Sequence, residues 1–158
     1  GKGAAAAALV LDLGKGVLAV LAAKALLPQE PWSHVLAALA AAAGHNWPIF
    51  VGFRGGRGVV VSAAALGVMN PLVLLAIIVA GLTVIWRTRF VSLGSVLGAA
   101  LAPPLMLLSY TQGSIPFPYL AYSIAGAALI IAAHRDNIAR LLAGTEARLG
   151  QSALKSQA

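Results

Sequence analysis

The chain has no cysteine and little charge. Asp, Glu, Lys and Arg make up 9% of its 158 residues, whereas 60% are hydrophobic and the mean hydropathy is +0.90. The absence of cysteine excludes disulfides and thiolate metal sites. Soluble domains carry about a quarter charged residues, so the scarcity of charge excludes that class. The composition instead predicts an all-α, polytopic integral membrane protein.

Acidic residues are the scarcest charged class, with four Asp and Glu against eleven Lys and Arg. The resulting net charge of +7 would suggest a nucleic-acid partner in a soluble protein. Here the cations lie between apolar runs, where membrane orientation and anionic lipid explain them better, so no nucleic acid is expected. Asp12 and Lys15 interrupt the first apolar run, which argues against a cleavable signal peptide.

The apolar runs predict about six membrane segments, two of them short. The first is long enough to span at roughly 20 residues per crossing. The six segments cover residues 4–27, 33–44, 59–69, 72–86, 91–110 and 119–133.

The arginines predict how these segments are oriented. If Asn70-Pro71 is a turn, the arginines at 54 and 57, at 87 and 89, and from 135 onward all fall on one side of the membrane. The connections without Lys or Arg then fall on the other side. By the positive-inside rule the cation-bearing side is cytoplasmic. Lys24, near the outer end of the first segment, fits this arrangement poorly.

Residues 44–58 are the one stretch where glycine, arginine, histidine and proline crowd together. In Phe53-Arg54-Gly55-Gly56-Arg57-Gly58, glycines allow successive N–H groups to converge on one anion. Arginine adds donors that suit phosphate or carboxylate. A helix starting at Val59 would bring its N-terminus to the same anion. The stretch therefore predicts a phosphate cradle at a membrane surface; the alternative is a tight turn with positive-inside anchors.

Two further stretches carry polar groups. Asp12 and Lys15 are three residues apart, so they can pair on one helix face. Either the pair is structural, or Lys15 faces a functional site. In the C-terminal stretch, a helix ending near Gly144 would present His134 and Asn137 together, with Asp136 and Arg140 paired on another face. The alternative for that stretch is a surface-lying amphipathic helix.

The residue inventory narrows the chemistry. No Ser-His-Asp arrangement or thiol nucleophile is present. His45 and His134, with Asp136 or Glu146, lack metal-ligand spacing, so neither a metal nor another cofactor is expected. The loop also lacks the Gly-Lys-Ser/Thr end of a nucleotide P-loop. What remains is the binding, transfer or transport of phosphate groups at the bilayer.

The motifs resemble those of one family. Gly44-His45-x-Trp47-Pro48, followed by residues 53–58, resembles the second motif of the PlsY family, the bacterial acyl-phosphate:glycerol-3-phosphate acyltransferases. The stretch from His134-Arg135-x-Asn137-Ile138 to Gly144-Thr145-Glu146 resembles the third motif. Residues 89–95 and Asp12-x-x-Lys15-Gly16 resemble two further family stretches, in family order.

Two departures from the family pattern stand out. Arg57 occupies a position where the family usually has lysine. The family also begins with another transmembrane helix and a first motif, so residues 1–158 are expected to be a single transmembrane acyltransferase domain without them. Residues 113–117 echo that first motif superficially, but they fall in a loop on the opposite side and no arginine follows.

The resemblance implies transfer of a fatty acyl group from acyl phosphate to the sn-1 hydroxyl of glycerol 3-phosphate, giving lysophosphatidate and phosphate. The implied acyl-phosphate-binding residues are Gly55, Gly56, Arg57, Gly58 and Ser92. Those implied for glycerol 3-phosphate are Arg57, His134 and Asn137. His45 or His134 would take the hydroxyl proton, unless the departing phosphate does, and Glu146 would be structural. The acyl chain would lie in a groove between helices.

The resemblance also implies a multi-pass protein of the bacterial inner (plasma) membrane, with a cytoplasmic active site. It leaves the oligomeric state open. Two other hypotheses remain from the residues alone. One is a small anion transporter or channel subunit, which predicts inverted repeats. The other is a purely structural membrane protein. Gly56→Leu is predicted to abolish acyl transfer while leaving a folded, membrane-inserted protein.

Overall fold

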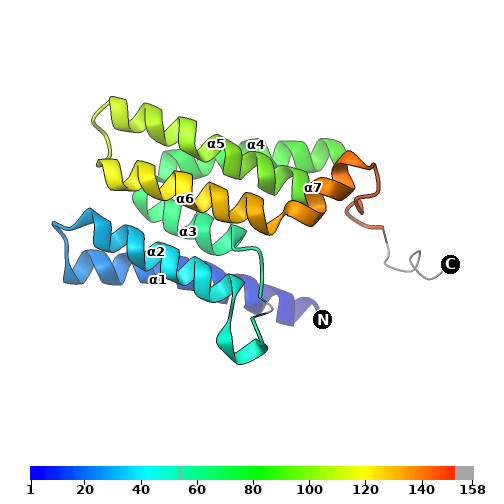
Figure 1. Ribbon diagram of the computed structural model, residues 1–158, viewed down its shortest axis with the longest axis horizontal. Coiled ribbons are helices and arrows are strands. Elements are labelled where there is room, and N and C mark those ends of the chain that lie inside the picture. Colours follow the sequence, from blue (N-terminus) through cyan, green and yellow to red (C-terminus); the bar gives the residue numbers. More distant parts are fainter. Residues whose placement is uncertain (54, 152–158) are drawn as a thin grey trace.

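The computed structural model describes residues 1–53 and 55–151, which form helices and no β-strand (Figure 1). The all-α prediction is therefore confirmed. In chain order the elements are α1 (Lys2–Leu26), α2 (Pro31–Asn46), the 3-10 helix η1 (Ile49–Val51), α3 (Val59–Met69), α4 (Pro71–Thr88), α5 (Val91–Thr111), α6 (Phe117–Ala133) and α7 (Arg135–Leu142).

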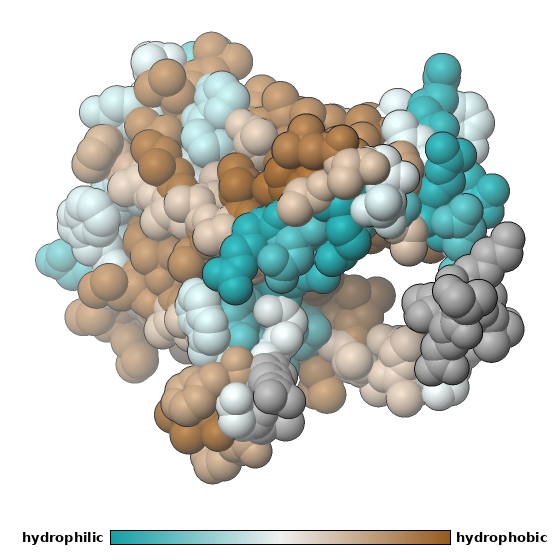
Figure 2. Space-filling model, turned by 45° about the vertical axis from the view of Figure 1, so that its right-hand side comes forward, coloured by the Kyte–Doolittle hydropathy of each residue, from teal (hydrophilic) through white to brown (hydrophobic). Residues whose placement is uncertain are grey.

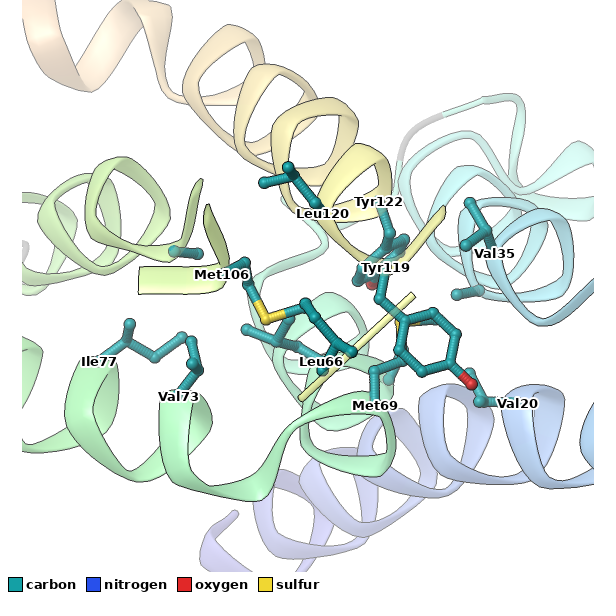
Figure 3. Close-up of a cluster of buried hydrophobic side chains, with 14 residues drawn as sticks. Val20, Val35, Leu66, Met69, Val73, Ile77, Met106, Tyr119, Leu120 and Tyr122 are labelled. Carbon is teal, nitrogen blue, oxygen red and sulfur yellow. The ribbon is translucent and has the colours of Figure 1, made fainter. Parts of the chain in front are cut away.

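The helices form one bundle with α3 at its centre (Figure 1). α1 and α2 make an antiparallel hairpin, and α1 also packs along α3. α5 packs between α4 and α6. Side chains of α1 to α6 meet in a buried cluster that includes Val20, Val35, Leu66, Met106 and Tyr122 (Figure 3).

Fewer helices can cross a membrane than the sequence predicted. Within the described residues, Gly3–Leu26, Pro71–Thr88 and Val91–Thr111 are long and apolar enough to span. α6 and α7 make a fourth span only if they count as one, and they are bent by 61°. All six apolar segments do form helices, but about six membrane segments is too high a count. α3, with 11 residues, rises only about 16 Å at 1.5 Å per residue, roughly half of the hydrocarbon core.

The turn at Asn70-Pro71 is real, as the orientation argument required. The Val73 N–H donates to Asn70 Oδ1 at 3.1 Å, which caps α4, and Pro71 occupies its first turn. Asn70 Nδ2 also donates to Ser109 Oγ of α5 at 2.9 Å. The chain therefore reverses between α3 and α4. As a result, the connections before α3 and between α4 and α5 lie at the same end of the bundle as α7 (Figure 1).

A hydrogen bond to α3 explains why Lys24 lies at the end of the bundle opposite α7. Its Nζ donates to the Val68 carbonyl at 3.0 Å, close to the C-terminus of α3, where the helix dipole favours a cation. The same ammonium lies 5.6 Å from the centre of the Tyr119 ring. Lys24 thus links α1 to α3 and α6. Residues 113–117 lie at this end too, away from α7 (Figure 1).

Candidate functional site

The candidate site lies where α2 ends, α3 and α5 begin, and α6 bends into α7. Hydrophilic residues gather across this end of the bundle and are bordered by apolar surface (Figure 2). The predicted site residues lie together at this one end.

The glycine–arginine stretch folds back onto the end of α2. The Gly55 N–H donates to the Asn46 carbonyl and the Gly56 N–H to the His45 carbonyl, each at 3.2 Å. A Cβ added to Gly56 would overlap Nε2 of His45. A side chain at position 56 would therefore have to displace the His45 ring, which lies directly against the loop.

The donors available to an anion differ from the predicted set, because the Gly55 and Gly56 N–H groups are already bonded to α2. The first backbone bond of α3 joins the Ser62 N–H to the Gly58 carbonyl at 2.9 Å. The N–H groups of Val59, Val60 and Val61 precede that bond and point out of the helix N-terminus. An anion at this end of α3, beside exposed Arg57, would meet these N–H groups and the helix dipole.

Asn46 was not among the predicted site residues. Its side chain is 6% exposed, and within residues 1–53 and 55–151 neither Oδ1 nor Nδ2 has a hydrogen-bond partner. Its Oδ1 would lie 2.7 Å from a Cβ added to Gly58, at the start of α3. Buried amides are nearly always paired, so this side chain marks a place for a polar ligand or water. The sequence signal was an amide ending an alanine-rich helix.

His45 is also held by α1. Its Nδ1 lies 3.2 Å from Asp12 Oδ1, and the same oxygen accepts a 3.0 Å hydrogen bond from Lys15. The predicted pairing of Asp12 with Lys15 is confirmed. The Lys15 side chain is 53% exposed, whereas Asp12 contacts His45. Asp12 therefore reaches the site, and Lys15 faces outward.

His134 occupies the bend between α6 and α7 and is 2% exposed. Its Nδ1 lies 2.8 Å from the Ile130 carbonyl, which can only accept, so Nδ1 carries the proton and Nε2 has a lone pair. Burial lowers the pKa of His134 and the Ile130 bond opposes that shift. The positive charge of Arg57 lowers the pKa further, and the negative charge of Glu146 raises it. The imidazole is therefore neutral near pH 7, and Arg57 is close enough for its charge to act on it.

Glu146 joins three elements of the site. Its Oε1 accepts hydrogen bonds from Ser92 Oγ at 2.6 Å and Asn137 Nδ2 at 2.7 Å. Its Oε2 accepts from Arg140 Nε at 2.7 Å. The predicted pair of Asp136 with Arg140 is wrong, because Arg140 turns toward this buried carboxylate and Asp136 stays exposed beside Arg135.

These bonds fix the charge of Glu146 and the orientation of Asn137. Burial raises the pKa of Glu146, but the bonds from Ser92, Asn137 and Arg140 outweigh it and lower the pKa to about 2. Because the carboxylate can only accept, Asn137 must direct its Nδ2 toward it. Asn137 Oδ1 is buried and has no partner within the part of the chain that the structure describes.

An apolar cavity of about 550 Å³ lies beside the start of α3. It is lined from α3 by Val59 and Val60, from α4 by Ile77 and Ile85, and from α5 by Gly98. Val59 is the first residue of α3, so the cavity borders the N-terminus of that helix. A ligand with a phosphate and a long apolar chain fits this arrangement.

Comparison with known proteins agrees with the resemblance noted in the sequence. The family model described as Glycerol-3-phosphate acyltransferase matches residues 1–144. A glycerol-3-phosphate acyltransferase of Prochlorococcus marinus is 46% identical over 152 residues, 96% of this chain and 74% of the relative. Glycerol-3-phosphate acyltransferase 2 of Moorella thermoacetica is 48% identical over 143 residues, 90% of this chain and 71% of the relative.

The fold has a solved counterpart. The crystal structure of PlsY (YgiH), an integral membrane glycerol 3-phosphate acyltransferase in its glycerol 3-phosphate form, superposes with a TM-score of 0.81. It is 34% identical, and the match covers 90% of this chain and 69% of that chain. This fold, the motifs at its polar end and the family match over residues 1–144 lead to one conclusion: the chain belongs to the PlsY family of integral membrane glycerol-3-phosphate acyltransferases.

Proposed function

We propose that this protein transfers a fatty acyl group from acyl phosphate to the sn-1 hydroxyl of glycerol 3-phosphate, giving lysophosphatidate and inorganic phosphate. The observation that supports the proposal is that the N-terminus of α3, beside Arg57, borders an apolar cavity of about 550 Å³. Acyl phosphate has this combination of a charged head and an apolar chain. Family membership favours the acyltransferase over an anion transporter.

The acyl phosphate would bind with its chain in the cavity and its phosphate at the N-terminus of α3. Arg57 supplies positive charge, the N–H groups that begin α3 supply donors, and Asn46 Nδ2 supplies a further one. Gly55, Gly56 and Gly58 allow the loop to lie close to α2. Ser92 would act through Glu146, because its hydroxyl proton is already directed at that carboxylate.

Glycerol 3-phosphate would bind between Arg57 and α7. Its phosphate would pair with Arg57, whose charge already acts on His134. Asn137 Oδ1, which is buried and unpartnered in the described chain, would accept a hydrogen bond from a glycerol hydroxyl. Glu146 would hold Asn137 in this orientation by its 2.7 Å bond to Nδ2.

The reaction needs no protein nucleophile, because an acyl phosphate is already an activated mixed anhydride. The sn-1 hydroxyl oxygen attacks the acyl carbon, the bond from that carbon to the phosphate oxygen breaks, and the phosphate leaves. Nε2 of neutral His134 takes the hydroxyl proton. Arg57 and the α3 N-terminus stabilise the leaving phosphate. His45, packed against Gly56 and bonded to Asp12, shapes the loop.

We further propose that residues 1–158 act as one transmembrane domain of a bacterial inner membrane, with the site on the cytoplasmic face. The gathering of Arg57, Arg87, Arg89 and Arg135 at the end that carries the site supports this orientation.

The test is an acyl-transfer assay on this chain in lipid nanodiscs, with labelled glycerol 3-phosphate and, in turn, acyl phosphate, acyl-CoA and acyl carrier protein as donors. We expect labelled lysophosphatidate from acyl phosphate alone. His134→Ala should lower the rate by about 100-fold or more, as loss of a general base does. Arg135→Gln, which changes an exposed neighbour, should leave it unchanged. Product from acyl-CoA but not from acyl phosphate would overturn the proposal.

A further inference from the structure

An exposed apolar loop lies between the end of α2 and the glycine–arginine stretch. We call residues 47–53, which include η1, the apolar loop. Ile49, Phe50 and Phe53 are 73%, 101% and 62% exposed, and Trp47 is 49% exposed. These four large apolar side chains follow one another closely in a part of the fold where no helix packs over them. Contiguous exposed apolar surface of this kind marks an interaction site.

Two backbone hydrogen bonds close the apolar loop on itself, and a third joins its first residue to α2. The Phe53 N–H donates to the Pro48 carbonyl at 3.0 Å, and the Gly52 N–H donates to the Ile49 carbonyl at 3.4 Å. The Trp47 N–H donates to the Ala43 carbonyl at 2.8 Å, and Pro48 has no N–H. Backbone groups that lack partners are costly in lipid, and these three bonds reduce the number of such groups in the loop.

The position of the loop along the bundle matters as much as its composition. The loop projects sideways beside the first half of α1, and does not extend beyond the end of the bundle (Figure 1). His45, two residues before the loop, contacts Asp12 of α1, and directly before Asp12 the helix exposes Leu9, Val10 and Leu11, by 49%, 65% and 63%. These residues belong to the membrane-capable span Gly3–Leu26. The loop therefore lies at a level where the neighbouring helix also exposes apolar side chains.

We propose that the apolar loop is inserted into the lipid leaflet that borders the candidate site. Phe50 and Ile49 contact acyl chains, and Trp47 lies near the headgroups, where its amphipathic ring is favoured. Exposed Arg57, shortly after the loop, adds attraction to anionic headgroups. The loop is thus a membrane anchor outside the spanning helices.

The anchor has a consequence for substrate access, which rests on the proposed function. Gly55 and Gly56 follow the loop almost directly and are bonded to the end of α2. A loop fixed in the leaflet holds this stretch at the depth of lipid phosphates. An acyl phosphate dissolved in the leaflet then reaches the site laterally, whereas glycerol 3-phosphate arrives from water.

Tryptophan quenching tests the insertion without any activity. The chain has three tryptophans, Trp32, Trp47 and Trp86, and replacing each by Phe leaves a silent background. Phe50→Trp in that background places a reporter where the side chain is fully exposed and makes no packing contact that the change could disturb. In vesicles of phosphatidylcholine and phosphatidylglycerol, we expect strong quenching by lipids brominated on the acyl chain and little quenching by aqueous iodide.

A matched reporter at Ala147, exposed in the segment after α7, should show the reverse pattern in the same background. Quenching of the Phe50→Trp reporter by iodide and not by brominated lipid would overturn the proposal. Protection from both quenchers would also overturn it, because it would mean that protein covers the loop.

Substrate kinetics test the consequence separately. Phe50→Asp should raise the KM for vesicle-borne acyl phosphate by about tenfold, the factor that corresponds to ~1.4 kcal/mol. The KM for glycerol 3-phosphate should stay unchanged. Equal changes in both KM values would contradict the role of the loop in acyl-phosphate access, but not its insertion into the leaflet, which the quenching experiment tests. Absence of acyl transfer in the parent chain would count against the proposed function alone.

Discussion

Ser92 Oγ donates a 2.6 Å hydrogen bond to Glu146 Oε1, which ties the start of α5 to the segment after α7. Asn137 and Arg140 donate to the same carboxylate. In Glu146→Gln, an NH2 group replaces one carboxylate oxygen, so a donor faces one of these donors. The substitution also removes the negative charge that pairs with Arg140. We expect a loss of about 1–3 kcal/mol in the free energy of unfolding, the cost of leaving a buried polar group unpaired.

Unfolding in detergent, followed by temperature or denaturant, measures this loss. Asp136→Asn is the matched control, because it also neutralises an acid of this region but at a side chain that is 76% exposed. It should change stability little. Equal effects of the two substitutions would contradict the role given to Glu146.

The low pKa of Glu146 predicts how this stabilisation depends on pH. The folded state holds the pKa at about 2, against an ordinary value of 4.5. The unfolded chain therefore binds a proton first as the pH falls, so the contribution is complete above pH 4.5 and is lost between 4.5 and about 2. The difference in stability between the parent chain and Glu146→Gln should be constant above that window and shrink within it. A difference that stays constant down to the lower limit would contradict the assignment.

Gly56→Ala should destabilise the loop, because the new methyl overlaps Nε2 of His45. Overpacking of this kind costs about 1–3 kcal/mol. Gly14→Ala in α1 is the control, since a Cβ there meets nothing within 4 Å. Truncating the ring removes the overlap, so His45→Ala combined with Gly56→Ala should lose less stability than the two separate losses added together. Strict additivity would show that His45 and Gly56 do not constrain each other.

Asn46→Leu separates ligand binding from folding. The substitution removes two buried polar atoms that have no partner in the described chain, so stability should stay equal or rise. Binding of inorganic phosphate, followed by phosphorus NMR on the protein in nanodiscs, should weaken. Asn46→Asp should weaken it more, because a carboxylate repels the anion. Unchanged phosphate binding in both variants would remove Asn46 from the site.

The order of helices, and the gathering of the predicted site residues at one end of the bundle, could be read from the sequence, because both depend on local signals. At the Asn70-Pro71 turn, Asn70 caps α4 and Pro71 cannot continue α3. This turn places the connections without arginine at the end of the bundle away from the site. Residues 53–58 were singled out by glycine and arginine alone. The number of spans could not be read as reliably, because the apolar character of α3 does not distinguish a membrane crossing from a short helix buried in the bundle centre.

The partners of polar groups were harder to predict, because they depend on contacts between distant segments. Arg140 has an acid at i−4, Asp136, and another six residues ahead, Glu146; only packing of α7 against α5 decides that the second is used. The partners of the N–H groups in the glycine loop could not be predicted for the same reason. A glycine-rich sequence indicates that N–H groups can converge on a ligand, but not that α2 has already taken two of them.

The bonds from the Gly55 and Gly56 N–H groups to the end of α2 set up a competition. An anion that uses these two N–H groups competes with the last carbonyls of α2 for the same donors. A phosphate that recruits the N–H groups of Gly55 and Gly56 must first detach them from the Asn46 and His45 carbonyls. Breaking each bond costs about 1 kcal/mol, so the affinity for such an anion is roughly thirtyfold lower than in a loop whose N–H groups are free. A ligand bound in this way leaves the His45 and Asn46 carbonyls at the C-terminus of α2 without these partners, and the Gly55 and Gly56 amides then report the ligand. A ligand held only by Arg57 and the first turn of α3 leaves both carbonyls capped.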